Sequence, residues 1–231
     1  MDILYEDNHL LALNKPAGML SQGDETGDRS VVDWATEDIR RRYNKPGNVY
    51  VGLVHRLDRP VSGVIVLART SKAAGRLSEQ FRAGTVEKTY WAVVEGRVAE
   101  EEGEWSDTLL KDEARNVVSV VPEGTGGGKR ASLAFRVLGR RAGTSWIELR
   151  PTTGRSHQLR VQVASRGLPI VGDRKYGAKS TLRAEDGGLR VALHARSLRF
   201  THPTTKEWLS VIAPVPGDWP WRTGGSSTRP G

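Results

Sequence analysis

The stretch VHRLDRPVSG, residues 54–63, places a single carboxylate among several bases. Asp58 lies between Arg56 and Arg59, and Pro60 follows them. Because Pro60 lacks an N–H and disfavours helical backbone at the residue before it, we predict an extended loop here. Taken alone, the segment is typical of a solvated cluster of ion pairs on a surface. A nucleophile for an anionic substrate would require the same arrangement.

Apolar segments flank this loop on both sides. VYVGLVHRL, residues 49–57, predicts a strand that leads directly into Asp58. GVIVLART, residues 63–70, is a nearly continuous apolar run and predicts a buried strand. A strand–loop–strand connection can present a side chain at the edge of a sheet, and we expect Asp58 to lie at such an edge.

The rest of the chain predicts more strands than helices, and most of the strands fall in hairpins. Further strands are expected at residues 2–7, 9–15, 86–98, 131–140 and 145–151, and in a final hairpin over residues 194–214 with its turn near Pro203 and Thr204. Helices are expected from Ser30 to Tyr43, from Ser71 to Gly84 and from Ser156 to Gly167, each with its serine as N-cap. The fold class is therefore α+β with a mostly antiparallel sheet.

The composition favours an anionic partner. The chain has 231 residues, of which 35 are Lys or Arg and 27 are Asp or Glu, so its net charge is +8. This balance is typical of proteins that bind nucleic acid. The sequence has no cysteine, which excludes disulfides and a cysteine nucleophile. Neither a signal peptide nor an apolar run of roughly 20 residues is visible, so we expect a cytoplasmic protein that does not bind membranes.

Several classes of enzyme lack their characteristic parts. The glycine tract GTGGGK, residues 124–129, is not followed by the Ser or Thr of a phosphate-binding loop. The five histidines are scattered without the spacing of metal ligands, and no G-x-S-x-G elbow occurs. No second acidic residue lies near Asp58 in the sequence, as a glycosidase would require. We therefore expect neither a metal nor a cofactor.

A second group of polar residues lies in PTTGRSHQLRVQVASRGLPIVGDRKYG, residues 151–177. His157 and Arg160 are three residues apart, so they share one face if the segment is helical. Arg155 and the first N–H groups of this helix would suit a phosphate. Taken alone, the segment is also typical of a charged helix that follows a turn.

Tyr90 lies in the predicted strand at residues 86–98. By strand alternation it shares a face with Lys88 and Ala92. A tyrosine in a strand most often packs in the core or at a sheet edge. It takes on a chemical role only if Asp58 is catalytic.

Together these segments resemble the RluA-type family of pseudouridine synthases. The resemblance rests on five motifs in the family's order: LNKPAGMLS (13–21), HRLDRPVSGVIVLA (55–68), VEKTYWAVVEG (86–96), TGRSHQLRVQVASRGLPIVGDRKYG (153–177) and LHARSLRFTHP (193–203). They cover most of residues 2–216. The segment at residues 55–68 resembles the family's nucleophile motif, and the segment at residues 86–96 resembles its tyrosine strand. The segment at residues 153–177 resembles what is known in the family as its third motif.

The resemblance implies a pseudouridine synthase fold, with a mixed, mostly antiparallel central sheet, flanking helices and loops, and a catalytic cleft across the sheet. We expect one catalytic domain over residues 1–217 and a flexible tail over residues 218–231. It implies an isomerase that acts on specific uridines in structured RNA, either tRNA or rRNA, without a cofactor. The C1′–N1 bond breaks, the uracil turns, and a C1′–C5 bond forms.

The resemblance also assigns the catalytic residues. Asp58 becomes the essential carboxylate, and it attacks the sugar, attacks the base or removes a sugar proton; the sequence leaves these three open. Tyr90 packs on the target base and takes the proton from C5. Arg160 pairs with Asp58. Arg56 enters the RNA stack when the target base flips out, which offsets part of the cost of unstacking.

The remaining residues of these motifs are expected to bind the substrate. They are His55, Leu57, Arg59, Arg155, His157, Gln158 and Leu159, of which Leu159 lines the uracil pocket. The chain departs from the family pattern at Val61, where a hydroxyl residue is common, and at Gln162, where histidine is frequent.

Two other functions remain in view. One is a catalytically idle protein that binds or remodels RNA on the same fold, although such a protein would not require Asp58, Tyr90 and Arg160 together. The other is a nucleoside hydrolase, which would need a second carboxylate or a metal. For the synthase we expect a monomer that acts on RNA and not DNA. We expect no RNA-binding module before the catalytic domain, so the loops at 15–29, 122–130 and 174–190 would choose the target.

Overall fold

The computed structural model describes residues 1–44, 46–183 and 187–221. The strands of its main sheet are β1 Asp2–Glu6, β2 Leu10–Lys15, β3 Gly52–Leu53, β4 Ser62–Ala68, β5 Glu87–Glu95, β6 Glu102–Asp112, β7 Val117–Val121, β8 Lys129–Arg141, β9 Thr144–Pro151, β12 Leu193–Thr201 and β13 Trp208–Ile212. The helices are α1 Val31–Arg42, α2 Ser71–Ala83 and α3 Gln158–Ala164, with a 3₁₀ turn at Arg174–Tyr176. A separate small hairpin joins β10 Leu182–Arg183 and β11 Leu189–Arg190.

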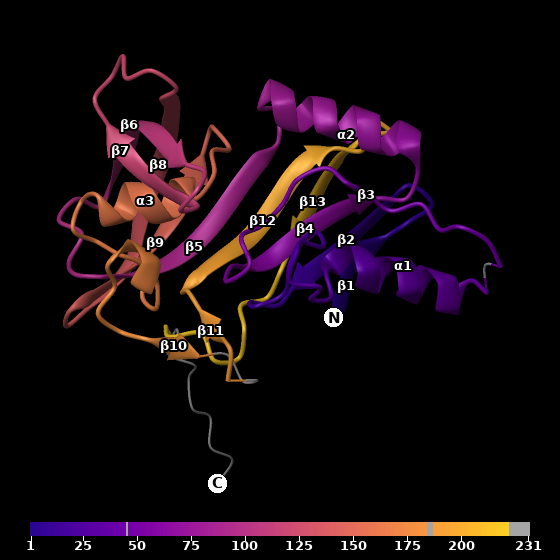
Figure 1. The fold of residues 1–231 in the computed structure, drawn as a ribbon, viewed down its shortest axis with the longest axis horizontal. Coiled ribbons are helices and arrows are strands. Elements are labelled where there is room, and N and C mark those ends of the chain that lie inside the picture. The colour runs from indigo at the N-terminus through magenta and orange to yellow at the C-terminus, as the bar shows by residue number, and fades with distance from the viewer. Residues whose placement is uncertain (45, 184–186, 222–231) are drawn as a thin grey trace, which may run out of the picture.

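The main sheet has 11 strands and runs through the whole molecule (Figure 1). Its order is β1-β2-β4-β12-β5-β9-β8-β6-β7, with β13 paired to β12 and β3 paired to β4. Among the described pairings only β12–β4 is parallel. This architecture confirms the α+β class and the mostly antiparallel sheet.

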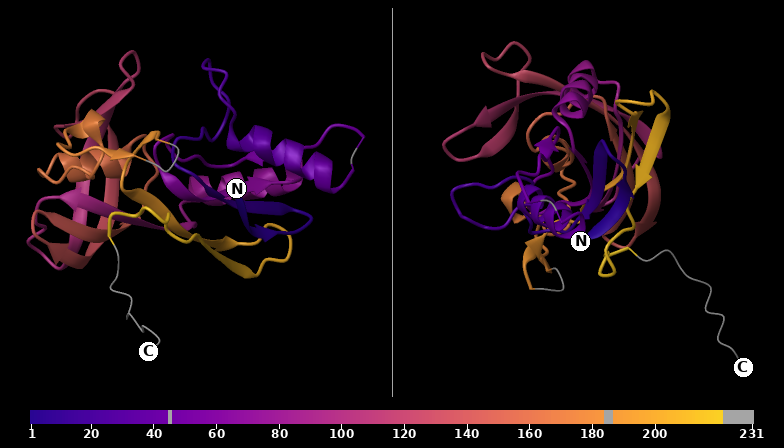
Figure 2. Two further views of the ribbon diagram at one scale, coloured as in Figure 1. Left: turned by 90° about the horizontal axis from the view of Figure 1, so that it is seen from below. Right: turned by 90° about the vertical axis from the view of Figure 1, so that its right-hand side faces the viewer.

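Helices cover both faces of the β2–β4 part of the sheet. Leu10 and Ala12 of β2 face the cluster that contains Leu77 of α2, whereas Leu11 faces the cluster that contains Ile39 of α1. This alternation explains why β2 and β4 are apolar on both sides. Figure 2 shows the two helices beside this part of the sheet.

At the other end, strands β6, β7 and β8 curl around α3 (Figure 1). Leu109 of β6, Val118 of β7 and Ala131 of β8 form a small cluster with Val161 of α3. No strand was predicted over residues 99–121, so β6 and β7 were missed, whereas β8 overlaps the strand predicted at residues 131–140. The strands of this part of the sheet lie at its edge and carry many charged residues, which weakens the apolar signal.

The helix boundaries follow the predicted caps in part. Ser30 forms a capping box with Asp33, as predicted. The N-cap of α2 is Thr70 and not Ser71, because the extended Thr70 accepts a hydrogen bond from the Ala73 N–H. The N-cap of α3 is His157 and not Ser156, because the chain turns through the left-handed region there, with φ of 49°. A left-handed residue cannot continue an α-helix, so α3 begins one residue later.

The strand predicted at residues 49–57 is wrong in length, because only β3 pairs with β4. The β12 strand pairs with the beginning of β4 and β3 with its end, both on the edge opposite β2. Between them His55 takes the place of a strand, since its Nε2 accepts the Val66 N–H at 2.9 Å. The chain then leaves the sheet, so Asp58 lies on a loop above it.

The predicted tail begins too early. Trp219 and Trp221 are buried in the main core, so packed structure extends to Trp221 and not only to residue 217. Residues 222–231 of the predicted tail lie outside the described part of the chain. None of the described helices has the length and apolar character needed to cross a membrane.

Candidate active site

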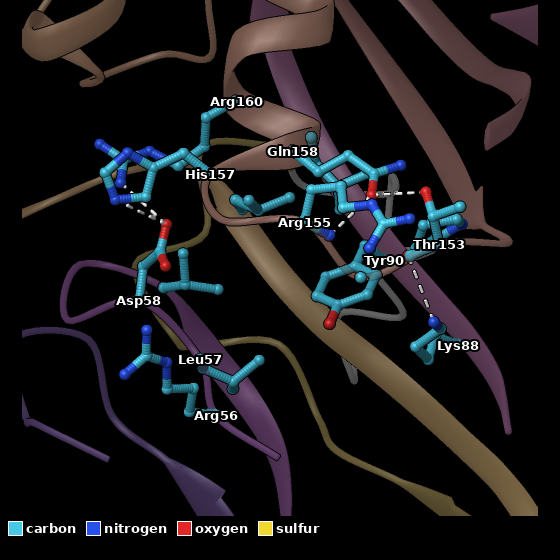
Figure 3. Close-up of a pocket in the computed structure, with 15 residues that line it drawn as sticks. Arg56, Leu57, Asp58, Lys88, Tyr90, Thr153, Arg155, His157, Gln158 and Arg160 are labelled. Carbon is cyan, nitrogen blue, oxygen red and sulfur yellow. Dashed lines mark hydrogen bonds and ion pairs between the residues drawn. The ribbon is translucent and has the colours of Figure 1, made fainter. Parts of the chain in front are cut away.

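A pocket of about 130 Å³ lies between the loop that carries Asp58, strand β5 and the segment that leads into α3 (Figure 3). Many of the predicted site residues line it. They are Arg56, Leu57, Asp58, Tyr90, Arg155, His157, Gln158, Leu159 and Arg160. The fold thus brings together three motifs that are far apart in the sequence.

An ion network fixes the carboxylate of Asp58. Arg160 donates from Nη1 to Asp58 Oδ2 at 2.9 Å, as the resemblance implied. Its Nε and Nη2 donate to the two oxygens of Asp173 at 2.7 and 2.9 Å. This two-point contact sets the plane of the guanidinium and aims Nη1 at Asp58. Burial by itself would lower the pKa of Arg160, but the two carboxylates raise it above its ordinary value.

Asp173 was not among the predicted site residues. It is only 1% exposed, and both of its oxygens are used by Arg160. The signal for it lay in the sequence GDRKYG within the third motif. No separate role was predicted for Asp173 within that motif.

His157 approaches Asp58 from the same side as Arg160. Its Nε2 lies 3.8 Å from Asp58 Oδ2, and its Nδ1 lies 2.6 Å from the hydroxyl of Tyr176. That hydroxyl also accepts the Val118 N–H. Burial lowers the pKa of His157, although Asp58 opposes the shift. One ring nitrogen of His157 thus faces the Asp58 carboxylate and the other contacts the Tyr176 hydroxyl.

The wall opposite Asp58 is flat and apolar. The ring of Tyr90 lies across the pocket from Asp58, and Leu57 and Leu159 supply aliphatic surface (Figure 3). Burial raises the pKa of Tyr90, with a smaller contribution from the charge of Asp58, so the phenol stays neutral. Such a wall suits a planar aromatic base by stacking.

The first motif holds the loop of Asp58 in place. Ser21 donates to the Leu57 carbonyl at 2.7 Å and accepts the Leu57 N–H at 3.0 Å. Lys15 is fully buried and donates to three backbone carbonyls, one of them that of Arg59 at 3.1 Å. Burial lowers the pKa of Lys15 to about 7. The loop is thereby tied to the segment after β2 on both sides of Asp58.

Two predicted substrate-binding residues do not line the pocket. His55 stacks on Phe81 with ring centroids 4.6 Å apart, and burial lowers its pKa to about 3. Arg59 turns to the neighbouring loop, where its Nη2 lies 2.6 Å from Asp28 Oδ2. Both residues stabilise the loop and do not line the pocket, and their predicted part in substrate binding stays a prediction.

Polar groups form the rim of the pocket. Arg56 is exposed and has no polar side-chain or backbone partner among the described residues. Gln158 orders the segment before α3, since its Oε1 accepts from Thr153 Oγ1 at 2.7 Å and from the Arg155 N–H at 3.0 Å. Lys88, which was predicted only to share a face with Tyr90, donates to the Thr153 carbonyl at 3.3 Å. The rim therefore carries positive charge above an apolar floor.

No group of three or more potential metal ligands occurs within the part of the chain that the structure describes. The chemistry available to the pocket is that of one aimed carboxylate, a neutral histidine and a neutral phenol. These groups suit attack on, or proton removal from, an uncharged ring system that carries phosphate on its outer side.

Known proteins resemble the chain in sequence and fold. The model of a family described as RNA pseudouridylate synthase matches residues 9–165. A ribosomal large subunit pseudouridine synthase C of Vibrio vulnificus is 36% identical over 222 residues, which cover 92% of this chain and 65% of that protein. The chain thus spans slightly less than two thirds of that relative's length.

Two further proteins match over nearly their whole length. A tRNA pseudouridine synthase C of Haemophilus ducreyi is 36% identical over 241 residues, with 95% of this chain and 93% of that protein covered. The solved structure of human RNA pseudouridylate synthase domain containing 4 has a TM-score of 0.77 and 26% identity. That match covers 94% of this chain and 89% of the human chain.

Proposed function

Because the chain belongs to the RNA pseudouridylate synthase family, we propose that it converts uridine in structured RNA to pseudouridine. The observation that supports this most strongly is the pairing of Asp58 with Arg160 at 2.9 Å, opposite the ring of Tyr90 in one pocket. An aimed carboxylate, a paired cation and a flat wall for a base are the parts that the reaction needs.

The reaction is a rearrangement within one nucleotide. The C1′–N1 bond breaks, the uracil turns, and C5 bonds to C1′. C5 then loses its proton and N1, which carried none in uridine, gains one, so atoms and electrons balance without an oxidant or reductant. All of the chemistry can therefore be carried by side chains that donate, accept or stabilise charge.

Asp58 acts on the nucleotide by one of three routes: attack at the sugar, attack at the base, or removal of a sugar proton. Each route needs an ionised carboxylate that is held in one orientation inside a pocket. Arg160 supplies the opposite charge, and Asp173 fixes the direction in which that charge points. The same geometry thus serves any of the three.

Tyr90 packs on the uracil ring. Since burial raises its pKa, Tyr90 is a neutral phenol, so it takes the C5 proton while it releases its own hydroxyl proton. N1 gains one proton in the same reaction, so the number of protons balances. Leu57 and Leu159 complete the apolar surroundings of the base. Exclusion of water there strengthens the interaction between Asp58 and the sugar.

Entry of the uridine requires that it leave the RNA stack, which costs a few kcal/mol. Arg56 lies exposed at the mouth of the pocket and has no partner within the described residues, so it is available to fill the gap. Its planar guanidinium stacks on bases, which lysine does less well.

The RNA is a tRNA or an rRNA. The printed names of the relatives include both classes, a ribosomal large subunit enzyme in Vibrio vulnificus and a tRNA enzyme in Haemophilus ducreyi. The loops at residues 15–29 and 122–130 would select between them. The net charge of +8 supports binding to either.

We place the enzyme in the cytoplasm as a monomer that acts on RNA and not on DNA. The large apolar side chains that are exposed among the described residues are spread over β1, β7, β13 and the stretch from Tyr43 to Tyr50. A stable dimer usually needs one continuous apolar patch. Light scattering coupled to size exclusion should therefore give the mass of one chain.

Release of tritium tests the activity, because the C5 hydrogen is lost in the reaction. Unmodified tRNA and rRNA that carry uridine tritiated at C5 should release label with the wild type and not with Asp58→Asn. A matched control, Asp2→Asn, changes an exposed carboxylate on β1 and should release label like the wild type. Absence of release with the wild type would refute the proposal.

A further inference from the structure

A second hollow adjoins the proposed active site. It has a volume of about 260 Å³ and lies between β6, β7 and β8 and the segment before α3. Gly154 and Arg155 line both this hollow and the pocket of Asp58. The two spaces therefore share a border at this short segment.

The rim of the hollow is cationic, and its accessible lining is more polar than apolar. Leu109 and Val118 lie beneath it but are each only 3% exposed. On the rim, Lys129 is exposed and its ammonium has no partner among the described residues. Lys111 is neutralised by a salt bridge to Glu113.

Arg155 joins the rims of the two spaces. Its Nε donates to the Arg130 carbonyl at 3.0 Å, which holds the guanidinium at the edge of β8. Its terminal amino groups make no hydrogen bond within the described residues. Together Arg155 and Lys129 present two uncompensated positive charges at the border of the hollow.

Gly154 has no structural requirement to be glycine. Its backbone lies outside the left-handed region, and a Cβ built there would meet no atom within 4 Å. Gly154 therefore leaves open space beside the border that the pocket and the hollow share.

We propose that this hollow binds the nucleotide next to the target uridine in the same RNA strand. Lys129 and Arg155 bind its phosphate. A positively charged groove that follows the backbone is one of the means by which proteins hold single-stranded nucleic acid. The inference rests on the proposed function, because it takes the pocket of Asp58 as the place of the uridine.

Binding of a decauridylate labelled with fluorescein tests the subsite without requiring catalysis. Lys129→Gln should weaken binding about tenfold at low salt and reduce the slope of log K against log salt by about 0.7, the value for one phosphate of a single strand. The matched variant Arg97→Gln removes one exposed charge beyond the other end of β5 and should stay within about twofold of the wild type. Equal effects of the two substitutions would overturn the subsite.

Steady-state tritium release separates this inference from the proposed function. If the wild type is active, Lys129→Gln should raise KM about tenfold and leave kcat within about twofold, because the phosphate contact is the same in the ground state and the transition state. An unchanged KM with an active wild type would refute the subsite alone. An inactive wild type would refute the proposed function, and the decauridylate result would still decide whether the hollow binds RNA.

Discussion

The carboxylate of Asp58 is oriented by a buried arginine that is itself fixed by a second buried carboxylate. Arg160 and Asp173 are 5% and 1% exposed. Ion pairs at such depth contribute little net stability, because desolvation offsets the attraction. These ion pairs instead orient the guanidinium of Arg160. Its Nη1 points at Asp58 because Asp173 binds its Nε and Nη2.

Replacement of Arg160 by lysine tests this directional role. A lysine keeps the charge but cannot bind Asp173 through two nitrogens and reach Asp58 at once. We expect Arg160→Lys to lower kcat about 100-fold with little change in KM, because a misplaced catalytic group costs about that factor. Steady-state tritium release at saturating RNA measures both parameters.

Arg166→Lys is the matched control for that experiment. Arg166 follows α3 and also contacts one carboxylate through two nitrogens: its Nη1 and Nη2 donate to Oδ2 and Oδ1 of Asp107 at 3.0 and 3.3 Å. It lies outside the pocket, so its substitution should leave kcat unchanged. Wild-type kcat in Arg160→Lys would contradict a directional role for Arg160.

For single residues, the sequence predicted which residues belong to one motif better than it predicted which residues contact one another in the fold. Asp58 and Arg160 are 102 positions apart, so their pairing was implied only by the resemblance. The place of His55 beside Arg56 gave no sign that it completes the edge of β4. Asp173 was missed because its contact with Arg160 depends on the fold and leaves no local pattern.

Among the elements, the crossing of β4 and β12 determines where the Asp58 loop begins. Gly63 has φ of 116°, and a Cβ there would lie 2.3 Å from the Ala195 carbonyl oxygen. The two strands can approach this closely only because residue 63 has no side chain. The parallel pairing that starts β4 therefore depends on one glycine.

Gly63→Ala should destabilise the protein by about 3 kcal/mol or more, because it combines backbone strain with a steric clash. Urea denaturation followed by circular dichroism gives the free energy of unfolding. Gly75→Ala, in α2 with no atom near its Cβ, should instead stabilise by about 0.5 to 1 kcal/mol. A loss below 1 kcal/mol in Gly63→Ala would show that the strands can move apart at this point.

Elements with strong local signals were predicted well. Ser30 with Asp33, and the uniformly apolar β4, carry their signals within a few residues. The strand expected at residues 49–57 was too long, because β12 pairs with the beginning of β4 and leaves only its end for β3. This pairing joins segments far apart in the sequence, so local strand propensity could not predict it. The same limit applies to α3, whose start depends on the left-handed turn at His157.

Across the whole molecule, two histidines are buried in uncharged form. Burial lowers the pKa of His55 to about 3 and that of His194 to about 4. In the unfolded chain both titrate near 6.5, so below that pH the unfolded state binds more protons than the folded state. The contribution to stability is thus fully present above pH 6.5 and is lost as pH falls toward 4.

Acid denaturation tests this linkage. Between pH 7 and pH 5 the free energy of unfolding should fall by about 2 kcal/mol for each of these histidines. In His55→Gln, which keeps an acceptor for the Val66 N–H, the fall should be smaller than in the wild type by that amount. His9→Gln serves as a control outside the core and should follow the wild type. An identical fall in His55→Gln would mean that His55 gains access to water in the folded state.

The measurement that tests the account most directly is a map of pseudouridines made in cells. The wild type and Asp58→Asn would be expressed in a host that lacks its own RluA-type enzymes, and pseudouridines would be mapped across total tRNA and rRNA. We predict at least one site that the wild type makes and the variant does not, which would identify the RNA and the need for Asp58 together. A site that persists in Asp58→Asn, or no site from either protein while RNA binding remains intact, would contradict the account.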